Sequence, residues 1–347
     1  MLALTLFGIF FAIALAGVPL LYSILITTTG IIALQGLGHP LETIFLSFIG
    51  GVEPFILLAV PLFIFAGELL AQGGVGKRIV EFARVLFGWL PGGLGVVTVI
   101  SCTMFGGVSG SAIADTAAIG SLVIPAMVAR GYSRGFAAAL LAVAGTIALL
   151  MPLSIPFLVY AFISGVSMRT LSMAGLLPAL ATAVALIVMC MWHGKKTGVD
   201  NGEDRSTPAQ IWAATKDAGP ALMMPLIIVG GIWSGQFTPS ESAAVAVFYG
   251  LAVSLFYYRD LTWRHIPQLM LNAFSTSATV MLVIGATGAM AWLITVEQVA
   301  VQMAEWIQLV ATEQWMFLIL FNVCLLLLGI FIEPLPAMLL SAPLFLP

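Results

Sequence analysis

The chain has 347 residues, of which 61% are hydrophobic and only 8% are charged; an ordinary soluble domain has roughly 25% charged residues. Twelve basic and 15 acidic residues give a formal net charge of −3. This composition argues against a soluble enzyme, a nucleic-acid-binding protein and a secreted disulfide scaffold, because too few charges are available to cover a water-exposed surface. The sequence therefore predicts an all-α, polytopic membrane protein.

Apolar stretches long enough to cross a bilayer, which takes about 20 residues, recur along the whole chain. Gly17 and Pro19 divide the first long apolar run into two helices. Because no charged segment or small-residue cleavage site accompanies this run, we expect it to be retained as helix. The expected spans are 2–16, 17–36, 53–71, 171–194, 218–236, 239–258 and 273–296.

Three further apolar stretches are interrupted by turn-forming residues. The first, 93–128, contains a glycine and serine cluster and has basic residues at both ends. Because basic residues mark the cytoplasmic side, this stretch is predicted to be a re-entrant hairpin. Prolines interrupt 135–167, which is predicted to be a broken helix, and a Glu-Pro-Leu-Pro run interrupts the hairpin 315–347. Two amphipathic segments, 77–89 and 297–310, are expected to be arms along the membrane surface.

One hydrophilic segment, 195–217, holds eight of the 27 charged residues and is predicted to be a cytoplasmic linker. The same order of elements comes before and after it: two spans, a third span, an amphipathic arm and an interrupted hairpin. We therefore expect an inverted repeat, 1–194 and 218–347, with the N-terminus outside. Such repeats with discontinuous helices near mid-membrane are typical of secondary transporters. The second copy stops inside its hairpin and is expected to be truncated.

The interruption of the first hairpin carries the strongest binding signal. The helix arriving at Gly106 is expected to end in free carbonyls that suit a cation, and the helix leaving from Ser111 to begin with free amides that suit a carboxylate. Asp115 is an intramembrane carboxylate, which costs about 2.5–3.5 kcal/mol at a helix centre. The alternative is a small-residue packing patch, which leaves Asp115 unexplained. The candidate ion-binding and solute-binding residues here are Gly106, Gly107, Ser109, Gly110, Ser111, Asp115 and Thr116.

The two other interruptions supply further candidates. In the broken helix, Pro152 frees backbone carbonyls, and Thr146 and Ser154 add hydroxyl oxygens. The alternative there is a kinked helix without a ligand. Glu333, in the second hairpin, is a candidate to neutralise a cation or carry a proton, or alternatively lies at the outer surface. Sodium is the expected ion, and its candidate ligands are Ser109, Gly110 and Thr146.

Six short runs carry a family resemblance: PLFIFAGEL at 61–69, LPGGL at 90–94, GGVSGSAIAD at 106–115, IPAM at 124–127, RGY at 130–132 and FTPSESAA at 237–244. They resemble the large membrane subunit of tripartite ATP-independent periplasmic (TRAP) transporters, the DctM type of the ion transporter superfamily, over essentially the whole chain.

The resemblance implies an elevator-type transporter of the bacterial inner membrane, driven by Na⁺, that imports an organic acid with a carboxylate. It implies two protein partners, a periplasmic substrate-binding protein and a small four-helix membrane subunit, and no enzymatic cofactor. Ser109, Gly110 and Ser111 would form the first hairpin tip, with Thr146 and Pro152 opposite. The family usually has Gly-Pro-x-x-Pro-Pro-Ser at the broken helix; this chain has Ala-Leu-Leu-Met-Pro-Leu-Ser at 148–154, which puts the geometry there in question.

Two alternatives belong to other functional classes. Residues 107–110 read Gly-x-Ser-Gly, the pattern of rhomboid-type intramembrane serine proteases. A serine nucleophile needs a histidine base within hydrogen-bond reach, and the three histidines, His39, His193 and His265, fall in loops or at a span end. The other alternative is a channel or a non-transporting scaffold subunit, for which uptake would ignore the Na⁺ gradient.

Overall fold

The computed structural model describes residues 2–35, 38–299, 301–302 and 313–331, together with residues 334, 335, 337, 338 and 341. This described part of the chain is helical and contains no strand. Seven of its helical segments are long and apolar enough to cross a bilayer: Phe55–Gln72, Ala112–Ala129, Arg134–Ser164, Met168–Thr197, Pro208–Ser234, Pro239–Tyr257 and Ile266–Val296. The prediction of an all-α polytopic membrane protein is confirmed.

The chain divides into two compact units that interleave along the sequence. The larger unit contains Leu58–Leu158 and Val166–Ser275. The smaller unit contains Met1–Leu57, Val159–Gly165 and the segment from Thr276 onward.

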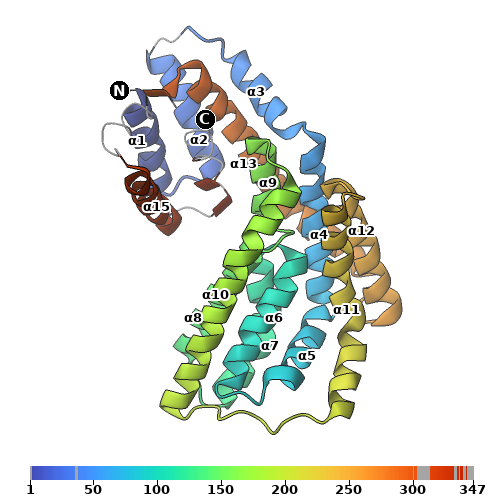
Figure 1. The fold of residues 1–347 in the computed structure, drawn as a ribbon. Coiled ribbons are helices and arrows are strands. Elements are labelled where there is room, and N and C mark those ends of the chain that lie inside the picture. Colours follow the sequence, from blue (N-terminus) through green and yellow to red (C-terminus); the bar gives the residue numbers. More distant parts are fainter. Residues whose placement is uncertain are drawn as a thin grey trace. The chain divides into compact units, whose positions relative to one another are not determined.

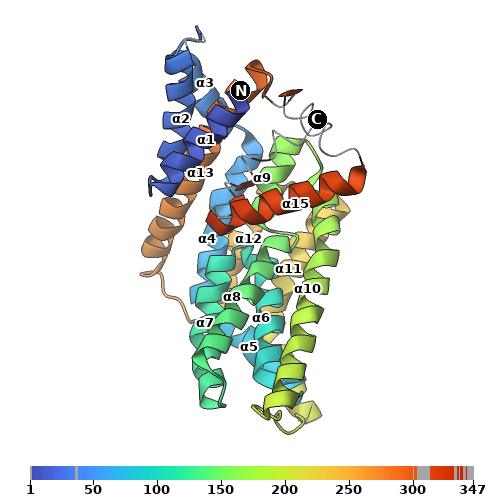
Figure 2. The same ribbon diagram turned by 90° about the vertical axis from the view of Figure 1, so that its left-hand side faces the viewer.

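The larger unit is a helix bundle with a largely buried helix at its centre (Figure 1 and Figure 2). That helix, α6 (Gly93–Ser109), is apolar on all sides and packs against α5 (Val75–Phe87), α7 (Ala112–Ala129), α8 (Arg134–Thr146) and α10 (Met168–Thr197). Around this group, α12 (Pro239–Ala252) packs on α4 (Ala59–Gln72), and α11 (Pro208–Ser234) packs on α5. The first helix of the predicted hairpin is therefore the most buried helix of this unit, whereas its second helix, α7, is largely exposed.

The smaller unit contains α1 (Leu2–Leu15), α2 (Leu20–Gln35), α3 (Glu42–Val52), most of α13 (Ile266–Val296) and α15 (Gln314–Phe331). Glycine residues allow the backbones of α3 and α13 to approach each other closely. A methyl group added to Gly51 would lie 3.4 Å from the Cα atoms of Gly285 and Gly288. Small residues of this kind let two membrane helices approach closely. η1 (Phe55–Leu58) continues the chain from α3 to α4.

Several predicted bounds differ from the structure. The hydrophilic segment between α10 and α11 is shorter than expected, because α11 begins at Pro208 inside the predicted linker 195–217. Thr207 and Gln210 form a capping box, and proline fits the first helical position, so helix starts early there. At 14 and 16 residues, α1 and α2 are shorter than the expected spans. Most of the arm 297–310 and the hairpin beyond 331 lie outside the described residues.

Candidate functional site

The first hairpin turns at a single glycine. Gly110 has a φ of 59°, in the left-handed region that glycine adopts without a steric penalty, and its amide donates to the carbonyl of Gly106 at 3.1 Å. Ser111 is extended and its hydroxyl accepts a 3.3 Å hydrogen bond from the amide of Ala114, which caps α7. The expectation that the first helix ends at Gly106 is wrong: α6 continues to Ser109, so the break is only two residues long.

A buried carboxylate lies directly beside this break. Asp115, in the first turn of α7, is fully buried, and the hydroxyl of Ser109 donates to its Oδ1. Among the residues that the structure describes, no hydrogen-bond donor reaches its other oxygen, Oδ2. That oxygen faces Gly106, because a methyl group added to Gly106 would lie 2.8 Å from it. A buried carboxylate oxygen without a partner is costly, so this site favours a bound proton or cation.

The broken helix packs against the hairpin tip. After α8 the chain forms η2 (Ile147–Leu150), becomes extended at Met151, and resumes helix at α9 (Ile155–Ser164). A methyl group on Gly110 would lie 2.5 Å from the carbonyl oxygen of Leu153, and one on Gly106 would lie 2.8 Å from the Cα of Ala148. Backbone therefore meets backbone at the break, and only glycine permits this approach.

Five of the predicted site residues come together in this way. Ser154 is fully buried, accepts a 3.3 Å hydrogen bond from the amide of Phe157, and has its Cα 3.0 Å from the position of a Gly110 methyl. We call the group the break site; it consists of Gly106, Ser109, Gly110, Asp115 and Ser154.

The remaining predicted residues lie beside or outside this group. Thr146 is exposed and its hydroxyl donates to the carbonyl of Val143, so it points away from the hairpin tip. Thr116 donates within its own helix to Ala112, and Pro152 accepts a 2.9 Å hydrogen bond from Ser172. A methyl group on Gly107 would lie 3.1 Å from the terminal methyl of Met151. Ser111 is partly buried at the cap of α7, and Glu333 lies outside the described residues.

The atoms of the break site that could coordinate a cation are all oxygen atoms: one carboxylate, two hydroxyls and nearby backbone carbonyls. Oxygen donors without nitrogen or sulfur suit a hard cation. In the described part of the chain, no group of three His, Cys, Asp or Glu residues is arranged to hold a metal ion.

The histidine positions argue against a serine protease. His193 stacks on Phe136, with ring centroids 4.0 Å apart, and His265 lies 3.3 Å from Thr262. His39 contacts Glu297 at 2.8 Å in the smaller unit. The hydroxyl of Ser109 donates to Asp115 instead, so it has no histidine base among the described residues.

A second buried carboxylate lies at the opposite end of α6. The sequence did not predict its structural role. The side chain of Asp200 is only 1% exposed and accepts hydrogen bonds from the amide of Leu94 at 2.7 Å and from Tyr132 at 3.4 Å. Arg130 pairs with it at 3.1 Å. Burial, together with the charge of Asp200, raises the pKa of the Tyr132 hydroxyl.

Glu203 extends this cluster. It pairs with Arg84 at 2.7 Å and with Arg130 at 2.5 Å, and its amide donates to the carbonyl of Gly88. We call Arg84, Arg130, Asp200 and Glu203 the loop clamp. Its signal in the sequence is the group of acidic residues between α10 and α11, which by composition alone predicts only a hydrophilic loop.

Comparisons with known proteins identify the family of the chain. The family model "Tripartite ATP-independent periplasmic transporter, DctM component" matches residues 7–347. The C4-dicarboxylate TRAP transporter large permease protein DctM of Rhodobacter capsulatus is 35% identical, over 100% of this chain and 82% of its own length. The isethionate TRAP transporter permease protein DctMQ of Oleidesulfovibrio alaskensis is 36% identical (99% and 54%), and the 2,3-diketo-L-gulonate TRAP transporter large permease protein YiaN of Escherichia coli is 35% identical (86% and 70%).

The apolar helices and these relatives define a multi-pass permease subunit of the bacterial inner membrane, not an enzyme. The chain belongs to the DctM family of TRAP transporter large permeases.

Proposed function

We propose that this permease subunit carries a small organic anion across the membrane together with Na⁺, and that both bind at the break site. The observation that carries the proposal is the state of Asp115, which lies beside a two-residue helix break. Its Oδ2 is buried and accepts no hydrogen bond from any described residue. Irregular backbone at membrane depth is tolerated only inside protein or beside a water-filled cavity. Transporters use such breaks to bind ions and substrates.

Sodium fits the chemistry of the break site. The C-terminal end of α6 carries partial negative charge from its last carbonyls, and Asp115 adds a carboxylate beside that end. The hydroxyls of Ser109 and Ser154 are neutral oxygens close to the same backbone. A monovalent cation would neutralise the charge of Asp115, and oxygen ligands suit such a hard cation better than a transition metal.

An organic anion fits the other half of the break. The N-terminal end of α7 begins at the hairpin tip, and the partial positive charge of this helix end favours negative charge. The relatives are named for C4-dicarboxylate, isethionate and 2,3-diketo-L-gulonate, which are all small anions at neutral pH. We therefore assign this chain a carboxylate-containing or related organic acid as solute.

Transport would follow an elevator-like movement in which the first hairpin and the broken helix move as one body, with Na⁺ binding first and completing the anion site. We expect a periplasmic substrate-binding protein to deliver the solute and a small four-helix membrane subunit to complete the permease; the family description itself calls the transporter tripartite and periplasmic. Binding of Na⁺ and of the solute should then strengthen each other by the same factor.

The first test measures thermal unfolding of the purified chain in NaCl and in KCl at equal ionic strength. We expect Na⁺ to raise the melting temperature of the wild type and of the exposed control Asp204→Asn, and to leave Asp115→Asn unchanged. An equal Na⁺ effect in Asp115→Asn would place the ion elsewhere.

The second test addresses coupling in proteoliposomes that contain the complete transporter. Uptake of a C4-dicarboxylate or another organic acid should require an inward Na⁺ gradient and should be lost in Asp115→Asn. Uptake that ignores the Na⁺ gradient would instead favour a channel.

A further inference from the structure

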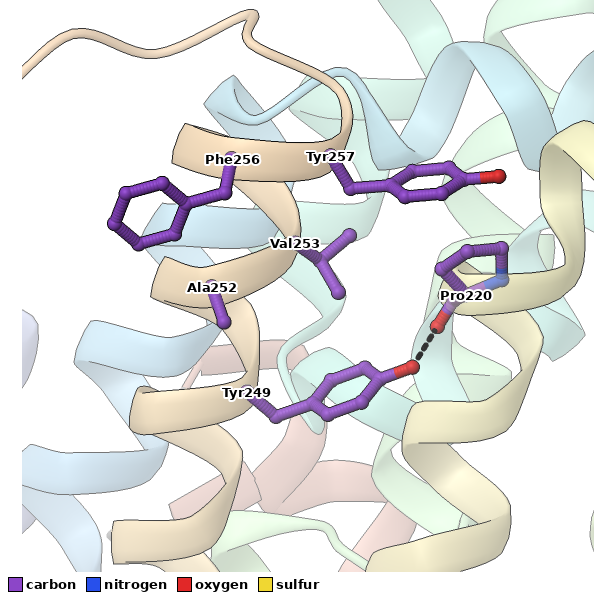
Figure 3. A pocket seen from close by; sticks show the side chains of 6 residues that line it. All are labelled: Pro220, Tyr249, Ala252, Val253, Phe256 and Tyr257. Carbon is purple, nitrogen blue, oxygen red and sulfur yellow. Dashed lines mark hydrogen bonds between the residues drawn. The ribbon is translucent and has the colours of Figure 1, made fainter.

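A groove of about 410 Å³ lies between α11 and the end of α12, away from the break site (Figure 3). The rings of Tyr249, on α12, and Tyr257, on the segment that follows it, reach toward α11, and Val253 lies between them. Pro220 closes the groove on the α11 side, and Phe256 projects away from α11. The lining is thus apolar except for the tyrosine hydroxyls.

The groove is built by two irregular helices. Pro220 removes a hydrogen bond from the interior of α11, and two tyrosines satisfy the backbone groups around it. The hydroxyl of Tyr249 donates to the carbonyl of Pro220 at 2.8 Å. The hydroxyl of Tyr258 donates to the carbonyl of Asp217 at 2.8 Å and accepts from the amide of Ala221 at 3.2 Å.

On the opposite side, α12 ends in a π-helix, η3 (Val253–Tyr257). Such segments are rare and occur frequently at functional sites. The hydroxyl of the adjacent Tyr258 is bonded to the backbone of α11, and burial raises its pKa to about 12. The groove is therefore a preformed feature of the helix ends.

Three exposed basic residues lie close in the sequence to residues that line this groove. Lys216 lies one turn before Pro220 on the same face of α11, and the Nε of Arg259 donates to the carbonyl of Phe256 at 3.3 Å. Arg264 follows in the next loop. Within the described residues, no carboxylate lies within 4.0 Å of the charged nitrogens of these three side chains.

Two acidic residues also lie here, but both face another partner. Asp217 and Asp260 lie 3.5 Å and 2.5 Å from Arg78, so their charge is shared with that guanidinium. The ring of Trp263, which is 67% exposed, meets Phe256 edge-on with centroids 6.2 Å apart. Exposed tryptophan together with basic residues marks the headgroup level on the cytoplasmic side of a membrane protein.

We propose that this groove binds an anionic phospholipid, with an acyl chain between Tyr249 and Tyr257 and the phosphate headgroup at Lys216, Arg259 and Arg264. An apolar groove with exposed basic residues on the segments that adjoin its lining has the two features that such a lipid requires. The bound lipid would hold the proline kink of α11 against η3.

The experiment uses native mass spectrometry of the full chain, loaded with an equimolar mixture of phosphatidylglycerol and phosphatidylcholine. We expect the wild type to retain phosphatidylglycerol preferentially. Ala252→Trp fills the groove from an exposed position and should abolish that preference. Phe248→Trp, on the same helix and 74% exposed but outside the groove, is the matched control and should retain the lipid.

The headgroup contact is tested separately. Replacing Lys216, Arg259 and Arg264 by glutamine should weaken phosphatidylglycerol retention by about fivefold for each charge removed. The same change at Arg134, Lys195 and Lys196 alters net charge equally and should have little effect. Equal retention of both lipids by the wild type, or equal losses in the two triple variants, would overturn the proposal. So would a photo-crosslinker at position 252 that captures the small membrane subunit instead of lipid.

Discussion

The two ends of α6 each lie next to a buried aspartate, and the two aspartates are treated differently. At the N-terminal end, Asp200 accepts hydrogen bonds from a backbone amide, a tyrosine and an arginine. At the C-terminal end, Asp115 accepts one from Ser109, and no donor among the described residues reaches its second oxygen. The positive end of the α6 dipole favours Asp200, whereas Asp115 lies between the negative end of α6 and the positive end of α7, which oppose each other.

This difference separates a structural carboxylate from a functional one. Asp200 is satisfied by the protein itself and fixes the loop between α10 and α11 to α6. Asp115 has one carboxylate oxygen without a hydrogen-bond partner at the point where the helix breaks. An external cation bound there would therefore stabilise the protein more than one bound beside Asp200.

Removing Asp200 should have the largest effect on stability. Asp200→Ala leaves the amide of Leu94 and the guanidinium of Arg130 without their partner, so we expect the free energy of unfolding to fall by about 3 kcal/mol. Denaturant or thermal unfolding in detergent measures this change. Asp204→Ala, an exposed acid four residues later, is the control and should change it by less than about 0.5 kcal/mol. Equal effects would mean that the loop clamp is not structural.

Adding a methyl group at Gly106, beside Asp115, should lower the free energy of unfolding slightly less than Asp200→Ala does. The methyl group of Gly106→Ala would lie 2.8 Å from the Cα of Ala148, and backbone must move to admit it, so we expect a loss of about 1–3 kcal/mol together with a weaker Na⁺ effect. Gly230→Ala is the matched control, because nothing lies within 4 Å of its added methyl. It should instead stabilise α11 by up to about 1 kcal/mol. A neutral Gly106→Ala would contradict the close packing described here.

Neutralising the two aspartates should separate stability from ion binding. Asp115→Asn removes an incompletely satisfied buried charge, so its free energy of unfolding without Na⁺ should stay within about 1 kcal/mol of the wild type. Asp200→Asn should lose more, because Arg130 then has a weaker partner. Unfolding measured with and without Na⁺ distinguishes them: only Asp200→Asn should keep the Na⁺ response. The opposite pattern would exchange their assigned roles.

The sequence predicts the hairpin because a glycine and serine cluster interrupts an apolar stretch that has basic residues at both ends. It also predicts Asp115, since an intramembrane carboxylate is conspicuous by type alone. The position of the break was missed by three residues: Gly106 and Gly107 are helix-breaking by propensity, but their missing side chains serve helix packing against Ala148 and Met151. Local propensity does not distinguish a glycine that turns the chain from one that admits a neighbour.

Two other features depend on contacts that sequence reasoning does not supply. Thr146 looks like a ligand by residue type, but the phase of α8 turns its hydroxyl toward Val143. The loop clamp joins residues 70 to 119 positions apart, and the position of Asp200 against α6 follows from the tertiary fold. Charge in a hydrophilic segment predicts only its side of the membrane.

The smallest expected effect lies at the edge of the loop clamp and depends on pH. Hydrogen bonds from Arg84 to Glu81 lower the pKa of that carboxyl from its usual value of 4.5, although burial opposes this change. Because the folded state holds the ionised form more strongly, this stability is present above the usual pKa and is lost as the pH falls through the lowered value. The pair is partly exposed, so its contribution should be a few tenths of a kcal/mol.

Glu81→Gln tests this contribution directly. At neutral pH the wild type should unfold at slightly higher denaturant than Glu81→Gln, and the gap should close as the pH is lowered below 4.5. A gap that persists in acid would assign the effect to packing of the side chain rather than to its charge. Because Glu203 also pairs with Arg84, the loop clamp should remain intact in Glu81→Gln. Removal of Asp200, in contrast, leaves the amide of Leu94 at the start of α6 without its hydrogen-bond acceptor.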